Sequence, residues 1–396
     1  MRIRAISWAV SHGITEIAAL NMRSRAFPSE LRLDRISLHS FSVELLAPVV
    51  GARQTHSLRR VWIVELVSDG ISGFGEVSAP EFPNYSHEWS SGSAYLLKRL
   101  ILPGLMERGS IDFRSLDWLV GNGSSRFAVE SALLDLHAKR GNAGITDFLG
   151  SMFGTDSYQK SRKLHFGVAI GTIGGWSNAL RELDRAAKKG VRRVKFKVDR
   201  VRAEEFASGE IEIDQVEVVL DFNGSLHVDE LGLLKDLDPM GLSFIEEPSL
   251  DLGLAGYKEL AVSLKTRLFI DETTDSRSAI NDMSSGFGVV VKPFRFGSIV
   301  FLHNTLELLA RRGTSCYLGG MFESSVGRRF LLAFGSHRCF TDIGDMAPST
   351  WYYSRDIEPD ICARVGLDYL TGTFDFGTDL THLPGHKCTE ACFTIE

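Results

Sequence analysis

Six charged residues recur at the ends of short apolar runs in this 396-residue chain. The runs are rich in β-branched residues, which predicts buried strands, and buried strands normally exclude charge. Charged side chains in such positions usually bind one another or a metal ion. In chain order they are two bases, three acids and a base: Lys195, Lys197, Asp221, Glu246, Asp271 and Lys292.

The three acids offer hard oxygen ligands from three successive strands. Asp221, Glu246 and Asp271 would suit octahedral Mg²⁺, with Mn²⁺ as the alternative ion, and would leave positions open for a substrate. Any one of them could equally cap a helix or pair with a surface lysine, but three in register favour a metal. In FIEEPS only one of the two adjacent carboxylates can point inward from a strand, and we expect it to be Glu246.

The lysines predict acid/base chemistry beside that metal. Lys195 and Lys197 are separated by one residue, so both side chains leave the same face of a strand. We expect their proximity and a nearby cation to lower the lysine pKa, which would make a neutral amine available as a base near pH 7. A lone K-x-K more often marks a solvated strand edge. With Lys292 on the opposite side, the set predicts removal of a proton α to a carboxylate, with the developing charge stabilised by the metal and the ammonium groups.

The spacing of the six residues predicts the elements that position them. Successive sites lie roughly 21 to 25 residues apart, about the length of one strand, one helix and two loops. Because only a closed (β/α) barrel converges all its strand ends on one centre, a barrel fits better than an open parallel sheet. The intervening helices are expected at 176–189, 229–236, 256–264 and 298–312.

The chain also has an organisation outside the barrel. Residues 1–33 form an N-terminal extension of uncertain order, residues 34–155 form an α+β domain, and residues 156–350 form the barrel. Within the α+β domain, Asp69-Gly70 is a strong turn signal between two strands.

Composition excludes several classes of protein. The net charge of −6 and the pI near 6.0 argue against a nucleic-acid partner. No apolar run is long enough to span a membrane, and the N-terminus makes a poor signal peptide. Five scattered cysteines do not form a disulfide framework, so a reducing cytoplasm is the expected setting. A homo-oligomer is compatible with the sequence.

The ordered set of motifs resembles the enolase superfamily, in its muconate-lactonizing branch, from about residue 35 to the end. The resemblance implies an α/β fold, a modified (β/α) TIM-type barrel, with an N-terminal α+β capping domain that the C-terminal segment 351–396 completes. It implies Mg²⁺ at the three acids and acid/base roles for Lys197 and Lys292 on opposite faces of a small anionic carboxylate substrate. It further implies that Lys195 tunes Lys197 and that Asn223 supports the metal site.

Narrower segments are similar to the o-succinylbenzoate synthases and N-succinylamino acid racemases of that branch, namely 73–89, 318–336 and 351–359. Arg295 in KPFRFG matches a pattern of this subgroup, although Gly297-Ser298 replaces its usual Gly-Gly. The resemblance implies dehydration of 2-succinyl-6-hydroxy-2,4-cyclohexadiene-1-carboxylate in menaquinone biosynthesis, or racemisation of an N-succinylamino acid. Tyr85 is expected near the substrate pocket, and Glu323 as a hydrogen-bonding scaffold on the seventh strand.

Other functions stay open at this point. A muconate cycloisomerase or a dipeptide epimerase would use the same barrel, but no acidic motif for a substrate amino terminus is clear. A sugar-acid dehydratase is disfavoured because GGMFES lacks the histidine typical of that strand. A catalytically silent barrel used as a scaffold is disfavoured because unpaired buried charges would only destabilise it.

Overall fold

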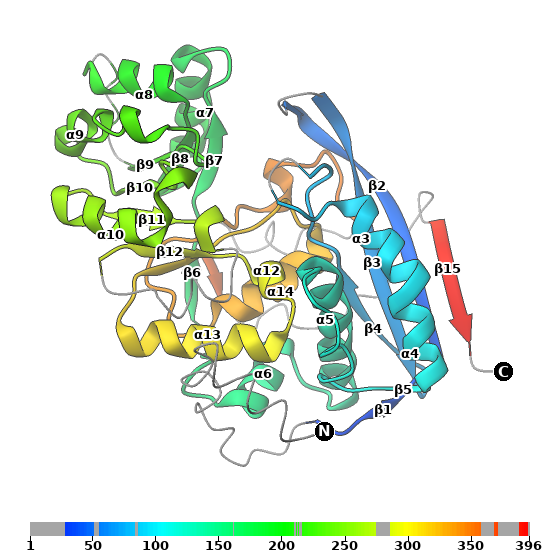
Figure 1. The fold of residues 1–396 in the computed structure, drawn as a ribbon. Coiled ribbons are helices and arrows are strands. Elements are labelled where there is room, and N and C mark those ends of the chain that lie inside the picture. The colour runs from blue at the N-terminus through cyan, green and yellow to red at the C-terminus, as the bar shows by residue number, and fades with distance from the viewer. Residues whose placement is uncertain are drawn as a thin grey trace.

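The protein divides its strands between two main sheets. One is parallel, has seven strands and curls into most of a barrel, and the other is antiparallel, has four strands and lies beside it (Figure 1). This arrangement confirms the predicted barrel with a separate α+β domain. The computed structural model describes residues 28–50, 55–83, 86–160, 162–209, 211, 213, 216–274, 286–357, 368–370 and 388–394.

The antiparallel sheet joins parts of the chain that are far apart in sequence. Its order is β15-β2-β3-β4, and β15 pairs antiparallel with β2 from Thr394 opposite Arg35 to Cys388 opposite Ser40. The C-terminal segment therefore completes the capping domain, as predicted. The strands are β2 (Arg35–Val50), β3 (Thr55–Ser68), β4 (Ile71–Glu76) and β15 (Cys388–Thr394).

A tight turn and a close helix shape this domain. Asp69 and Gly70 have φ values of 49° and 74°, and a two-residue type I′ turn requires φ above zero at both positions. Helix α5 packs so closely on β4 that a Cβ at Gly75 would lie 2.0 Å from the carbonyl oxygen of Ala128. The helical elements of the domain are α3 (Ser90–Leu96), the π-helical turn η1 (Leu97–Ile101), α4 (Leu102–Arg108), α5 (Gly123–Arg140) and α6 (Ile145–Phe153).

The seven barrel strands follow one another in chain order, from β7 to β13. They are short and apolar because helices cover their outer face while side chains such as Phe244, Phe269 and Tyr317 fill the interior. The strands are β7 (Val168–Gly171), β8 (Arg193–Lys197), β9 (Glu217–Asp221), β10 (Phe244–Glu246), β11 (Leu268–Ile270), β12 (Gly288–Val291) and β13 (Cys316–Leu318).

The helices between these strands match three of the four predictions closely. The predicted helix at 229–236 is instead divided into a 3-10 turn and a short α-helix, with Gly232, a poor helix former, between them. The helical elements are α7 (Trp176–Lys188), α8 (Arg200–Ala207), η2 (Val228–Glu230), α9 (Leu233–Leu237), η3 (Asp238–Met240), η4 (Leu250–Leu252), α10 (Gly253–Ser263), η5 (Glu272–Thr274), α12 (Pro293–Phe296), α13 (Ile299–Arg312), α14 (Ser325–Gly335) and η6 (Ser349–Trp351).

A short segment connects the two edges of the parallel sheet. Gly344 forms a parallel bridge with Phe166, just before β7, and Asp345 forms one with Gly319, just after β13. The N–H of Asp345 donates to the carbonyl of Leu318 at 2.9 Å. Residues 344–345 therefore occupy the position of an eighth strand.

Two minor strand pairs extend the structure. β1 (Leu31–Arg32) pairs with β5 (Ser110–Ile111), and β14 (Asp368–Leu370) pairs with β6 (Lys163–His165). Leu31 and Leu33 are buried in the apolar core. The packed domain therefore begins within residues 1–33, which were expected to form an extension. The extension's residues 1–27 lie outside the described part of the chain. Within that part, no helix has both the length and the apolar character needed to cross a membrane.

Candidate active site

The charged residues selected from the sequence lie at neighbouring strand ends. Parallel strands of a barrel present their C-terminal ends to one face, which is where barrel enzymes bind substrates. The register places Asp221 opposite both Lys197 and Glu246. Lys195 and Lys197 lie on β8, Asp221 ends β9, Glu246 ends β10, Asp271 follows β11 and Lys292 follows β12.

Lys195 lies inside the barrel and binds three carboxylates. Its Nζ is 3.1 Å from Asp221 Oδ2 and 2.8 Å from both Glu246 Oε1 and Asp345 Oδ2. Burial alone would lower the pKa of Lys195, but Asp221, Asp345 and Glu246 outweigh it and raise that pKa well above its ordinary value. The three carboxylates therefore hold Lys195 in its protonated form, and Lys195 does not supply the neutral amine expected of the pair. The structure instead makes Lys195 a permanent cation among acids.

Lys197 is the lysine of β8 that a substrate could reach. Its side chain is 46% exposed, and its Nζ lies 4.0 Å from Asp221 Oδ2. The Nζ also donates to Oδ1 of Asn223 at 3.1 Å. Between the two lysines, Phe196 packs edge-on against Trp176 of α7, with ring centroids 5.0 Å apart. The lysines therefore leave the strand on the face opposite the helix, as the alternation predicted.

Two cations surround Asp271. Lys292 Nζ lies 2.6 Å from its Oδ2, and an Arg295 guanidinium nitrogen lies 2.8 Å from its Oδ1. Burial would raise the pKa of Asp271, but Arg295 and Lys292 hold it well below its usual range. Burial also lowers the pKa of Lys292, and the positive charge of Arg295 adds to this effect while Asp271 opposes it. Lys292 is thus easier to deprotonate than an ordinary lysine, as a base near neutral pH requires.

The two acids of FIEEPS have separate tasks. Glu246 points into the barrel toward Lys195, as predicted. Glu247 instead accepts the backbone N–H of Asp271 at 2.5 Å and that of Thr273 at 3.1 Å, and the hydroxyl of Tyr257 at 2.9 Å. Glu247 therefore orients the backbone that carries Asp271.

Asn223 connects three charged groups at the site. Its backbone N–H donates to Asp221 Oδ1 at 2.9 Å, and its side-chain amide donates to Glu272 Oε1 at 3.1 Å while accepting from Lys197. The other oxygen of Glu272, Oε2, is buried without a hydrogen-bond partner in the described part of the chain. Burial and the adjacent Asp271 raise the pKa of Glu272 to about 7. An unsatisfied carboxylate oxygen here indicates that additional positive charge would be stabilised.

The donor chemistry of the three predicted ligands suits a divalent cation. Asp221, Glu246 and Asp271 are each no more than 1% exposed, and they come from three adjacent strands. Burial and the neighbouring Asp221 raise the pKa of Glu246, because the ionised carboxylates lack enough positive charge around them. A dication held by all three would supply that charge. Carboxylate oxygens favour Mg²⁺ or Mn²⁺ over ions that prefer thiolate or imidazole ligands.

Of the two remaining residues selected from the sequence, Glu323 and Tyr85, the structure describes only Glu323. Glu323 is buried, and its Oε2 accepts the N–H of Met321 at 2.8 Å within the loop after β13. This contact is the one expected of a scaffold residue. Tyr85 lies outside the described residues.

Two buried polar residues beneath the site, Arg193 and Tyr317, were not selected from the sequence. Arg193 donates to Asp345 Oδ1 at 2.8 Å, and its guanidinium lies 4.6 Å from the ring centroid of Tyr317. The Tyr317 hydroxyl donates to Glu246 Oε2. Arg193 could have been found, because it precedes Lys195 by two residues and so shares its strand face. Tyr317 carries no such signal, since it lies in a three-residue strand beside apolar neighbours.

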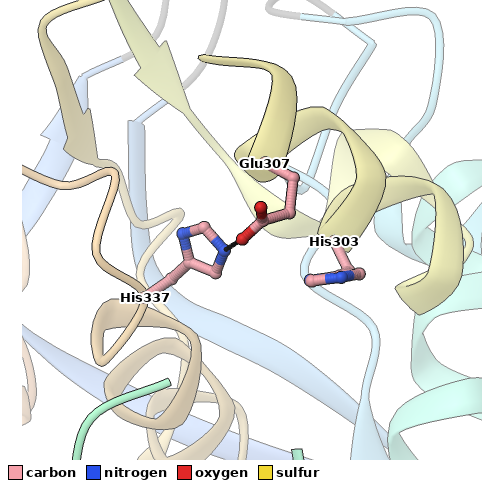
Figure 2. Close-up of side chains that lie close together, drawn as sticks. All are labelled: His303, Glu307 and His337. Atoms are coloured by element: carbon pink, nitrogen blue, oxygen red, sulfur yellow. Dashed lines mark hydrogen bonds and ion pairs between the residues drawn. The ribbon is translucent and has the colours of Figure 1, made fainter. Parts of the chain in front are cut away.

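Another group of potential metal ligands lies elsewhere in the barrel (Figure 2). His303 and Glu307 are one turn apart on α13, and His337 follows α14. One ligand atom from each lies within 4.8 Å of the others, and all three residues are buried. Imidazole and carboxylate together can bind zinc, so this group is a competing candidate for a metal site.

The hydrogen bonds of His337 argue against that assignment. The N–H of Cys339 donates to its Nδ1 at 3.2 Å, so the ring proton is on Nε2, which lies 3.1 Å from Glu307 Oε1. A metal at Nε2 would have to displace that proton. Just beyond His337, Thr341 donates to the carbonyl of Cys316 at the start of β13, which places the group at the N-terminal ends of the strands. Residues there usually serve stability.

Two family models match the chain, and together they span most of it. The model described as "Mandelate racemase / muconate lactonizing enzyme, N-terminal domain" matches residues 35–150, and "Enolase C-terminal domain-like" matches residues 178–363. The chain belongs to the enolase superfamily. It is therefore an enzyme of that superfamily, and its two matched regions correspond to the capping domain and the barrel.

Individual relatives within the superfamily are moderately similar. The o-succinylbenzoate synthase of Bacillus subtilis (strain 168) is 28% identical, over 84% of this chain and 90% of the relative. The N-succinylamino acid racemase of Amycolatopsis sp is 27% identical, over 86% and 94%. A structure of a probable mandelate racemase from Alicyclobacillus acidocaldarius superposes with a TM-score of 0.76 at 23% identity, over 92% and 99% of the two chains. That last likeness shows the fold.

Proposed function

We propose that this member of the enolase superfamily is a Mg²⁺-dependent o-succinylbenzoate synthase. Its substrate would be a small anionic carboxylate, 2-succinyl-6-hydroxy-2,4-cyclohexadiene-1-carboxylate, which loses water in menaquinone biosynthesis. The observation that carries the proposal is the placement of Lys197, which ends β8, and Lys292, which follows β12, on either side of three buried carboxylates. Several relatives named o-succinylbenzoate synthase, each 28% identical over more than four fifths of the chain, support the choice of substrate.

Each group has a role in the proposed reaction. Mg²⁺, when held by Asp221, Glu246 and Asp271, would stabilise negative charge on the substrate carboxylate. Lys197 in its amine form takes the α proton, and the Lys292 ammonium stabilises the charge that develops on the substrate. The Lys197 ammonium then returns that proton to the departing hydroxyl, which leaves as water. The proton and the electron pair of the C–H bond are both accounted for, since the pair forms the new double bond.

Racemisation of an N-succinylamino acid is the second candidate, because relatives with that name are as similar as the synthases. Here Lys197 removes the α proton from one face and Lys292 delivers a proton to the other. The lowered pKa of Lys292 supports this role, since it must act as a base in the reverse direction. Both reactions use the same residues, so substrate turnover must decide between them.

The deciding experiment supplies both substrates to the purified protein with Mg²⁺ and with EDTA. Dehydration is followed by absorbance and racemisation by chiral chromatography. The proposal expects rapid, EDTA-sensitive dehydration. Fast racemisation with slow dehydration would change the assigned function from synthase to racemase. Inactivity on both substrates would overturn the proposed substrate class. Lys235→Met, which changes an exposed lysine, serves as a matched control for later lysine variants.

A further inference from the structure

One tyrosine hydroxyl lies among charged groups beneath the proposed metal ligands. Tyr317 donates to Glu246 Oε2 and lies 3.4 Å from Lys195 Nζ and 3.3 Å from Asp345 Oδ2. A hydroxyl has a single proton to donate, and the shorter contact assigns it to Glu246. Each oxygen of Glu246 therefore has its own donor, Lys195 at Oε1 and Tyr317 at Oε2.

The surroundings of Tyr317 fix its hydroxyl in place. The residue is fully buried, and its ring centroid lies 5.6 Å from those of both Phe244 and Phe269. The Arg193 guanidinium lies over the ring and also binds Asp345, whose negative charge it helps to balance. The hydroxyl cannot move without displacing this interior layer of the barrel.

We propose that Tyr317 is a positioning residue that presets the Glu246 carboxylate for a divalent cation. This inference rests on the proposed function, because it assumes that Glu246 is a metal ligand. A ligand held by two donors loses little orientational freedom when the cation binds, and groups that orient metal ligands commonly contribute tenfold or more to affinity. Lys195 alone would leave the other oxygen of Glu246 without a donor.

A competing explanation is that Tyr317 only fills the barrel interior. The variant Tyr317→Phe separates the two, because it keeps the ring and its packing and removes only the hydroxyl. Tyr158→Phe is the matched control: Tyr158 is 2% exposed, and its hydroxyl has no hydrogen-bond partner among the described residues. Circular dichroism and urea unfolding without metal check that both variants fold.

Titration calorimetry with Mg²⁺ and with Mn²⁺ then tests the role. We expect the dissociation constant to rise about tenfold in Tyr317→Phe and to stay at the wild-type value in Tyr158→Phe. Equal affinity in Tyr317→Phe and the wild type would overturn the positioning role while leaving the proposed function intact. Failure of the wild type to bind either ion would overturn the metal assignment, and the role of Tyr317 with it.

Discussion

Lowering the pH from 8 to 5 should weaken the fold through one buried histidine, His303. Its side chain is 8% exposed, its ring centroid lies 4.0 Å from that of Phe153, and its Nδ1 has no hydrogen-bond partner among the described residues. Burial, reinforced by His337, lowers the pKa of His303 from 6.5 to about 4. Protonation in the folded state would place a buried charge against Phe153 and beside His337, which Glu307 offsets only in part.

The magnitude follows from the two pKa values of His303. Since the folded-state value is depressed, neutral His303 contributes stability that is present above pH 6.5 and lost as the pH falls toward 4. The difference of about 2.5 units corresponds to about 3 kcal/mol in full. About 2 kcal/mol of this should be lost between pH 8 and pH 5.

Urea unfolding at both pH values measures this loss. The variant His303→Leu keeps an apolar contact with Phe153 and removes the titrating ring. Its free energy of unfolding should fall by about 2 kcal/mol less than that of the wild type between pH 8 and pH 5. The control His227→Gln changes a side chain that is 79% exposed and should follow the wild type. An equal loss in the wild type and His303→Leu would refute the reasoning.

Three predictions concern the site itself. Lys197→Ala should abolish turnover with little change in Mg²⁺ affinity, because the Lys197 Nζ is 4.0 Å from the nearest proposed ligand. Calorimetry and a turnover assay test this, and full activity in the variant would contradict the assignment of Lys197 as the base. Asp271→Asn should weaken both metal binding and turnover and reduce the free energy of unfolding by about 3 kcal/mol, because Lys292 and Arg295 would lose a buried counter-ion; urea unfolding within experimental error of the wild type would contradict it. Lys292→Met should abolish racemisation but leave measurable, slower dehydration, since only racemisation needs a proton from the second lysine. Equal loss of both activities in the turnover assays would contradict this division of roles.

Much of the barrel could be predicted because its strands are buried on both faces. Such strands read as short apolar runs, and a charged residue at the end of each run, such as Asp221 or Lys292, stands out against them. The repeated strand and helix lengths then imply convergence at one face. The Asp69-Gly70 turn was predictable for a similar reason, because two adjacent positions with positive φ strongly favour that dipeptide.

The contacts beneath the site could not be predicted in the same way. The pKa of Lys195 depends on Asp345, which is far away in sequence and reaches the interior only because residues 344–345 bridge β13 and the start of the barrel. No periodic pattern marks a two-residue bridge. Tyr317 likewise lies in an apolar run, which predicts only a core residue. Its hydrogen bond to Glu246 joins two strands that are not neighbours in the sheet, so the sequence pattern does not indicate it.

The most direct test of the central claim is proton NMR of a substrate's α position in D₂O. The account predicts that the wild type, given Mg²⁺, removes the α proton, seen as dehydration of the cyclohexadiene carboxylate or as deuterium incorporation into an N-succinylamino acid. The same sample with EDTA should leave the α signal unchanged. Lys197→Ala with Mg²⁺ should do so for the cyclohexadiene carboxylate and for the N-succinylamino acid enantiomer whose α proton faces Lys197, because only the other enantiomer presents its α proton to Lys292. Loss of either of these two signals in Lys197→Ala, or persistence of the α signal in the wild type with Mg²⁺ for both substrates, would contradict metal-assisted α-proton abstraction by this lysine.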